Sequence, residues 1–284
     1  MVAETIESAV EFPPFRVPAY WYAAQRPRAT LLFLPALGTP ATYYGPLASA
    51  LADRGIEALL PEWPGTGDSR PRPARGVDYG YGDLVQRYLP PLFELAVSRS
   101  AGRPVLLGGH SLGAQVAALG RRYGYVAPAG IVTLAGGLIY FRYWGGLMGA
   151  GVYLLACFVS LLCRLRGYLP GHLVGFGGPQ AGRLMREWAV AIRCGNFPAL
   201  PAGPNKAAPV PALSLYYEGD PMAPRQSAAA LAQELGGELD CLEAERPGNP
   251  HASWARRPQA TVGRVEDWLV VSGLLPPREG LAGD

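Results

Sequence analysis

Charged residues are scarce in this chain, at 17% of 284 residues, whereas hydrophobic residues make up 49%. A chain of this length and composition can bury a large core, and we expect no disorder beyond its ends. The net charge of +3 comes from scattered arginines, with no basic block or basic run interleaved with aromatics. The composition therefore argues against nucleic acid as a partner.

Cysteine and histidine are also few, with four and three copies. Cys157, Cys163, Cys194 and Cys241 show no C-x-x-C spacing, so we expect free thiols and no structural metal. Residues 1–7 are acidic and lack the cationic region that leads into an apolar stretch in a secretory signal. The expected location is the cytoplasm.

Residues 105–119 contain the most informative pattern, an apolar run that ends at a glycine-flanked serine and continues with helical spacing. The run predicts a strand, a sharp turn and a helix, with G-x-S-x-G at the turn. A serine on so tight a turn leaves no room for side chains two positions away, and Gly109 and Gly113 meet that demand. Ser111 is therefore a candidate nucleophile, with the first N–H groups of the helix aimed at a developing oxyanion.

Short apolar runs alternate with helical patterns through most of the chain, which predicts an α/β fold with a mostly parallel sheet covered on both faces. Pro90 and Pro91 are expected to interrupt the second helical region. An early strand or hairpin is expected at residues 15–24. Beside the strand before Ser111, further expected strands cover residues 29–34, 56–60, 130–135, 210–217 and 238–242, and expected helices cover 43–54, 77–99, 226–235 and 260–271.

Residues 136–209 interrupt this alternation and show no clear strand. We predict a helical cap there, inserted into a core formed by residues 1–135 and 210–284. Within it, residues 144–163 carry no charge and are long enough to span a bilayer. A span would separate Ser111 from the C-terminal half, so a segment that lines the site is favoured. Peripheral membrane contact through the cap is the alternative.

A serine nucleophile needs a base, usually histidine. His110 lies inside the turn, where the ring is directed away from Ser111, and His172 lies in the predicted cap. His251 follows the last predicted strand in a loop, where a base could approach from the carboxyl edge of the sheet. We therefore predict His251 as the base.

The acid that orients the base is expected in the loop at residues 218–224, which offers Glu218 and Asp220. Asp220 is favoured because Gly219 allows a turn that aims its carboxylate inward. The chain order is then Ser, Asp, His.

These motifs together resemble the α/β-hydrolase fold superfamily over nearly the whole chain. Residues 62–69 are similar to the family's Asp-x-x-Gly-x-Gly-x-Ser turn, with Glu62 in place of Asp. Residues 35–38 (Pro-Ala-Leu-Gly) stand where many members carry His-Gly. With Gly-Tyr-Leu-Pro-Gly at 167–171, the chain most resembles an uncharacterised bacterial subgroup of predicted α/β hydrolases.

The resemblance implies a catalytic triad of Ser111, Asp220 and His251, and an oxyanion hole formed by the N–H groups of Leu37 and Leu112. We predict a serine hydrolase that cleaves a carboxylic ester of a small-molecule apolar acyl substrate through an acyl-enzyme, with no cofactor. An acyltransferase or thioesterase with the same triad is the alternative, because fold does not choose among them. A non-catalytic membrane-associated binding protein is a third possibility.

Overall fold

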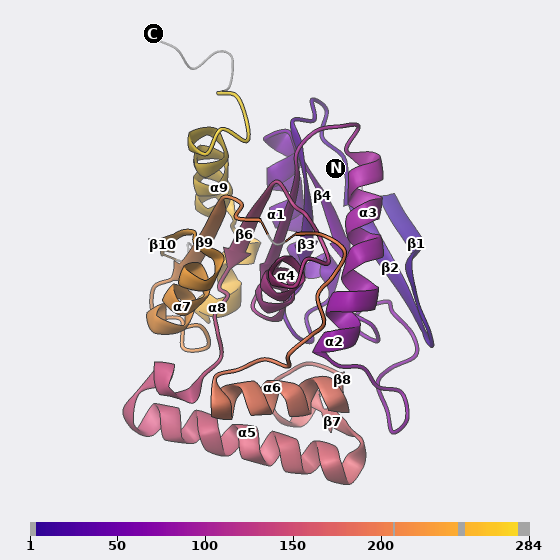
Figure 1. Cartoon of the computed structure of the whole chain (residues 1–284), viewed down its shortest axis with the longest axis vertical. Helices are drawn as coiled ribbons and strands as arrows, with labels where there is room; N and C mark the ends of the chain where they lie inside the picture. The colour runs from indigo at the N-terminus through magenta and orange to yellow at the C-terminus, as the bar shows by residue number, and fades with distance from the viewer. Residues whose placement is uncertain (1–3, 207, 244–247, 278–284) are drawn as a thin grey trace.

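The computed structural model describes residues 4–206, 208–243 and 248–277. Its centre is an eight-stranded sheet in the order β1-β2-β4-β3-β5-β6-β9-β10, shown in Figure 1. Strands β1 and β2 run antiparallel to their neighbours, and the six others are parallel. The strands are β1 Glu4–Phe12, β2 Phe15–Tyr22, β3 Ala29–Leu34, β4 Ile56–Pro61, β5 Val105–His110, β6 Gly130–Leu134, β9 Ala212–Tyr217 and β10 Glu238–Leu242.

Helices cover both faces of the sheet. One face packs against α3, α4 and the short α2 and η2, with α7 beside α4, and the other packs against α1 and α9. Their bounds are η1 Ala41–Tyr44, α1 Gly45–Asp53, α2 Tyr81–Asp83, η2 Leu84–Tyr88, α3 Leu89–Arg99, α4 Leu112–Arg122, α7 Arg225–Leu235, α8 Pro250–Ser253, η5 Trp254–Arg256 and α9 Gln259–Val271. The predicted α/β fold class is confirmed.

Strand β3 shows why its sequence is apolar throughout. Leu32 and Leu34 belong to the hydrophobic cluster on one face, whereas Leu31 and Phe33 belong to the cluster on the other. Since successive side chains of a strand point to opposite faces, a sheet covered on both sides needs apolar residues at every position.

The helical region before β5 differs from the prediction. Pro90 and Pro91 do not interrupt the helical region. Pro90 lies in the first turn of α3, where a missing N–H costs no helical hydrogen bond. The preceding five residues form a π-helical turn, η2, which joins α2 to α3. The early strand or hairpin expected at residues 15–24 is β2, which forms a hairpin with β1 at the edge of the sheet; β1 itself, at Glu4–Phe12, was not predicted.

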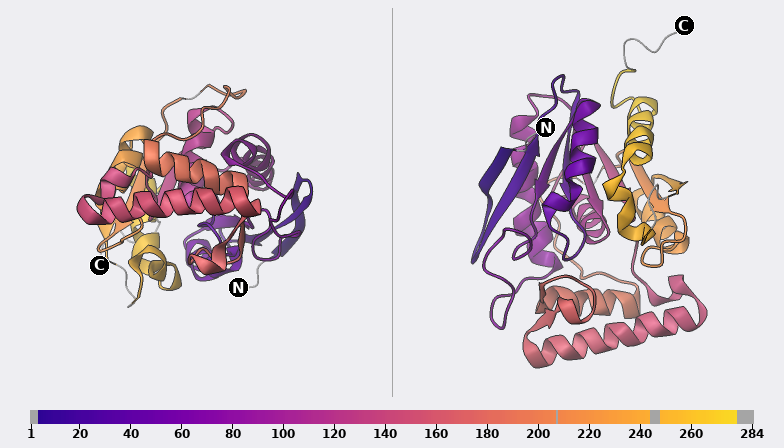
Figure 2. Two further views of the ribbon diagram at one scale, coloured as in Figure 1. Left: turned by 90° about the horizontal axis from the view of Figure 1, so that it is seen from below. Right: turned by 180° about the vertical axis from the view of Figure 1, so that it is seen from behind.

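The segment between β6 and β9 crosses one end of the sheet (Figures 1 and 2). It contains η3 Phe141–Trp144, α5 Gly146–Arg166, β7 Tyr168–Pro170, η4 Gly171–Leu173, β8 Pro179–Ala181 and α6 Gly182–Cys194. Sequence reasoning missed β7 and β8, a pair too short to show periodicity. Figure 2 shows α5 and α6 side by side, with α5 outermost. The division into core and cap stays a prediction, taken up in the Discussion.

Candidate active site

Ser111 occupies the turn between β5 and α4 with φ +52° and ψ −110°, a conformation that residues other than glycine rarely adopt. The two flanking glycines are needed because a side chain at either position would clash with nearby backbone atoms. A Cβ on Gly109 would lie 2.3 Å from the carbonyl carbon of Gly113. A Cβ on Gly113 would lie 2.1 Å from the carbonyl oxygen of Leu34. The turn therefore keeps its strained serine only because both neighbours lack side chains.

His251 and Asp220 meet through a hydrogen bond of 2.8 Å between imidazole Nδ1 and carboxylate Oδ2. The Asp220 side chain is fully buried at the turn after β9. Its other oxygen, Oδ1, accepts hydrogen bonds from the backbone N–H groups of Met222 (2.8 Å) and Ala223 (3.1 Å). These bonds fix the carboxylate so that it faces His251.

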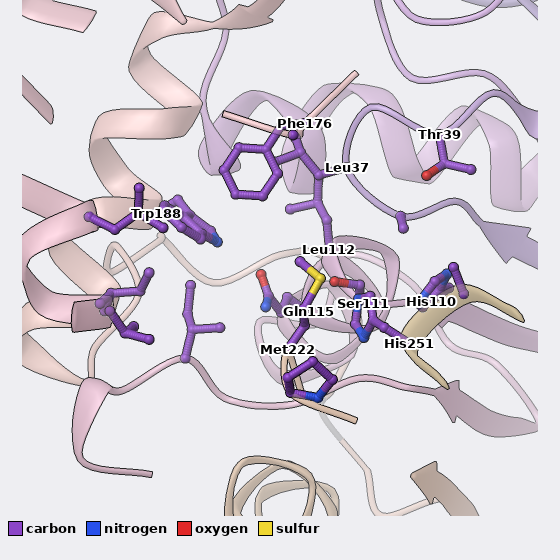
Figure 3. A pocket seen from close by; sticks show the side chains of 18 of the residues that line it. Leu37, Thr39, His110, Ser111, Leu112, Gln115, Phe176, Trp188, Met222 and His251 are labelled. Atoms are coloured by element: carbon purple, nitrogen blue, oxygen red, sulfur yellow. The ribbon is translucent and has the colours of Figure 1, made fainter. Parts of the chain in front are cut away.

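The loop that carries His251 is held at several points. Asn249 caps α8 by accepting a hydrogen bond from the His251 N–H at 3.0 Å. The indole N–H of Trp254 donates to the carbonyl of His251 at 2.9 Å, and the Trp254 ring stacks on Tyr217. In Figure 3 the side chains of His251 and Ser111 lie beside each other in the wall of one pocket.

The other two histidines have different surroundings. His172 is exposed in η4 and does not line the pocket. The ring of His110 is buried 4.7 Å from the ring of His251, centroid to centroid. Burial, and to a lesser degree the neighbouring His251, hold the pKa of His110 well below its usual range, so this ring is neutral. Packing a neutral ring there avoids placing a positive charge against the ring of His251.

A link that sequence reasoning missed joins the loop after β3 to the serine turn. The N–H of Ala36 donates to the Tyr44 hydroxyl at 3.0 Å, and this hydroxyl lies 2.7 Å from Nδ1 of His110. Burial raises the pKa of Tyr44, so the phenol keeps its proton. The next N–H in this loop, on Leu37, and the N–H of Leu112 have no hydrogen-bond partner among the described residues. Both groups are therefore available to an oxyanion.

Glu62 lies buried directly after β4 and supports the same loop region. Its Oε2 accepts a hydrogen bond of 2.9 Å from the Ala41 N–H, while Oε1 is buried and finds no partner among the described residues. Burial raises the pKa of Glu62 to about 7. A side chain on Gly67 would overlap the Glu62 carboxyl group, which explains a glycine at that turn position.

The pocket beside Ser111 has a volume of about 310 Å³ and a mainly apolar wall (Figure 3). Helix α6 contributes Leu184, Met185, Trp188 and Ile192 to this wall. From α5 only Val152 and Leu155 reach it. The apolar run at 144–163 thus lines the pocket through Trp144, Val152 and Leu155, and α6, which sequence reasoning did not single out, lines it as well.

Gln115, one helical turn after Ser111, is a pocket residue that sequence reasoning did not single out. Its Oε1 accepts from the Tyr81 hydroxyl at 2.7 Å, and its Nε2 donates to the Gly137 carbonyl at 3.2 Å. The sequence signal that could have identified Gln115 is its single amide side chain within an otherwise apolar helical run. No group of three side chains able to hold a metal occurs in the part of the chain that the structure describes.

Several solved structures share the fold at low sequence identity. A thermophilic esterase from Thermogutta terrifontis is 14% identical, with 95% of this chain and 99% of that chain covered and a TM-score of 0.64. A soluble variant of monoglyceride lipase from Saccharomyces cerevisiae is 14% identical, with 92% and 94% covered and a TM-score of 0.67. The thioesterase domain from the curacin biosynthetic pathway is 15% identical, with 92% and 99% covered and a TM-score of 0.55.

A comparison with curated protein sequences finds no significant match. The sequence model of the alpha/beta hydrolase family matches residues 31–264, which include the strands from β3 to β10 and the turn at Ser111. Fold, serine turn and family match agree, and the chain belongs to the alpha/beta hydrolase family.

Proposed function

We propose that this protein is a serine hydrolase that cleaves carboxylic esters with an apolar acyl group. Ser111 is the nucleophile, His251 the general base and Asp220 the residue that orients the base. The observation that carries the proposal is the 2.8 Å bond between His251 and a fully buried Asp220, with His251 and Ser111 in the wall of one pocket.

In this mechanism Nε2 of His251 takes the proton of Ser111 as Oγ attacks the ester carbonyl carbon. The N–H groups of Leu37 and Leu112 hold the resulting oxyanion. Collapse of the intermediate breaks the ester bond, and the leaving alcohol takes the proton from His251. Water then gives a proton to His251 and attacks the acyl-enzyme, which releases the acid and restores Ser111.

The apolar wall of the pocket supports an apolar acyl group as the substrate class. The same triad would hydrolyse a thioester or transfer the acyl group to an alcohol. Assays with an oxygen ester and a thioester of the same acyl chain, with and without an added alcohol, separate these activities by product.

A fluorophosphonate probe tests the nucleophile, because the serine oxygen bonds to phosphorus with loss of fluoride. We expect labelling of the wild type and none of Ser111→Ala, with turnover of an activated ester lower by at least about 10³-fold. Ser98→Ala, exposed on α3, is the matched control and should label and turn over normally. Normal turnover by a folded Ser111→Ala protein would remove Ser111 from the mechanism.

A further inference from the structure

Helix α5 carries an apolar face with no partner in the described part of the chain. Its large side chains that are more than half exposed, here called the outer face, are Leu147, Met148, Leu154, Phe158, Leu161 and Leu165, and Tyr153 and Leu155 are each 38% exposed. Leu147 is 93% exposed and Leu154 67% exposed, whereas Ala156 and Val159 on the opposite side are fully buried. α5 is long and apolar enough to cross a membrane, but 28% of its most apolar window is buried within the fold.

Large exposed apolar patches mark interaction sites, and α5 is about 31 Å long at 1.5 Å per residue. Figure 2 shows α5 as the outermost element at its end of the molecule, with α6 between it and the sheet. Nothing from the described core therefore covers the outer face.

The charges that this segment of the chain carries are almost all positive. Residues 136–209 contain seven Arg or Lys and one Glu, and no Asp or Glu occurs between Glu94 and Glu187. Arg164 and Arg166 are exposed in the last turn of α5, and no ion pair to either is found among the described residues. Arg142 lies exposed just before the helix. A cationic border around an apolar face complements an anionic lipid surface.

A protein partner fits the outer face less well. Protein interfaces carry about one hydrogen bond per 100–200 Å² of buried area, and among the large exposed apolar side chains of α5 the Tyr153 hydroxyl is the single N–H or O–H group. A second copy of this chain would also bring the arginines at the ends of α5 against arginines of the same sign.

We propose that α5 docks on the surface of an anionic bilayer, with its axis in the plane of the membrane and the outer face in the acyl boundary. Its inner face stays packed on α6, which a transmembrane orientation would not allow. Leu155 is 38% exposed and also lines the pocket, so α5 separates the bilayer from the pocket by the width of one helix. This part rests on the proposed function: the substrate class is then an ester that partitions into membranes.

The test uses the full chain with Ser111→Ala, so that vesicle lipids are not hydrolysed, in co-sedimentation with two kinds of vesicle. One contains phosphatidylcholine alone and the other equal parts of phosphatidylcholine and phosphatidylglycerol. We expect stronger binding to the anionic vesicles, and weaker binding as salt is raised. Equal or no binding to both would overturn the proposal.

Leu154→Glu/Phe158→Glu in the same background should weaken this binding by at least about tenfold, because two apolar side chains are replaced by anions. Val97→Glu/Val271→Glu, at exposed positions of α3 and α9, adds the same charge away from α5 and should bind as before. Equal losses in both pairs would mean that charge alone acts and would overturn docking through α5.

Two further readouts address the other occupants. Light scattering that shows a dimer lost in Leu154→Glu/Phe158→Glu, without vesicle binding, would assign the outer face to a second copy. Resistance of bound protein to carbonate extraction would indicate a span. Turnover of a soluble ester by Leu154→Glu/Phe158→Glu with Ser111 intact reports folding, and it keeps a failure of docking separate from a failure of catalysis.

Discussion

At the residue scale, the geometry of the site depends on a few close contacts between individual atoms. Ser111 keeps a positive φ because Gly109 and Gly113 clear the space around it. Two backbone N–H groups donate hydrogen bonds to the Asp220 carboxylate and fix its orientation toward His251. Because each group is held by others, the site should respond to substitution as a unit.

Ser111 and His251 should therefore be non-additive. In the proposed mechanism either residue alone does nothing for proton transfer and attack, so Ser111→Ala/His251→Ala should be about as slow as either single variant. The measurement is kcat/KM on an activated ester for all three. His172→Ala, on the exposed η4, is the control and should retain activity. A more damaging His172→Ala would show that the base has been misassigned.

Gly38→Ala should disturb the loop that presents Leu37. Gly38 has φ +68°, and a Cβ there would lie 2.2 Å from the carbonyl oxygen of Phe176. We expect kcat/KM to fall by at least about tenfold, since the N–H of Leu37 would shift.

The matched control is Gly273→Ala, because Gly273 has φ +72° but no atom within 4 Å of a new Cβ. It should lose about 1 kcal/mol of unfolding free energy to backbone strain and keep its activity. Equal activity of both variants would show that Gly38 matters only for its backbone angle.

At the scale of elements, two segments support the site and have a second property. The turn after β4 carries an ionisable group, and helix α5 carries an exposed face. Glu62 follows β4 directly and holds the N-terminus of η1 through Ala41. Helix α5 reaches the pocket on one side and solvent on the other. Each makes a prediction about stability or specificity.

Glu62 should make the protein less stable as pH rises from about 4.5 to 7. Its pKa is about 7 when folded against an ordinary 4.5, so the folded state binds more protons in this range and unfolding free energy falls with pH. The loss is at most about 3 kcal/mol. Urea unfolding at several pH values should give a smaller decrease for Glu62→Gln, which is neutral throughout. Parallel profiles for the two proteins would refute this.

Acyl-chain length should govern specificity. Each CH₂ buried in the pocket contributes about 0.8 kcal/mol, so kcat/KM should rise about fourfold per CH₂ until the pocket is full. p-Nitrophenyl esters from about two to twelve carbons measure this profile. Val152→Phe should move the maximum to shorter chains, because Val152 lines the pocket.

Val190→Phe, on the exposed side of α6, is the matched control and should leave the profile unchanged. A flat wild-type profile would remove the pocket from acyl recognition, and the apolar wall would then serve only packing between α6 and the sheet.

At the scale of the whole molecule, the hydrophobic contacts fall into separate clusters. Large clusters cover the two faces of the sheet. The elements between β6 and β9 contain two small clusters, one around Ala156 and Ile192 and one around Val159, Cys163 and Met185, while Ala181 and Leu184 join the large cluster on one face of the sheet. Separate clusters favour separate opening.

We therefore predict that residues 136–209 open as a unit before the sheet unfolds. Cys163 is fully buried on the inner side of α5, whereas Cys194 and Cys241 are exposed. The exposed thiols should react at once with an alkylating reagent, and Cys163 should react through an opening that costs less than global unfolding. Mass spectrometry of timed alkylation compared with urea unfolding measures the difference. Equal free energies for the exposure of Cys163 and for global unfolding would show that both regions unfold as one cooperative unit.

The sequence by itself determined the alternation of strands and helices and the glycine requirement at Ser111, because both follow from local periodicity and backbone geometry. It also indicated Asp220 and His251 through the chemistry and position of their loops. It did not reveal β7 and β8, or the passage of the chain through Pro90 and Pro91, since short pairs and π turns depend on their neighbours.

Only the tertiary structure decided which distant groups meet. The Asp220 and His251 side chains lie 31 residues apart in the chain, and the link from Ala36 through Tyr44 to His110 joins β5 to the loop after β3. The tertiary structure also decides which face of α5 is buried and which is exposed. An apolar helix is compatible with burial or exposure, and α6 occupies the inner side, so most of the large side chains of α5 point outward.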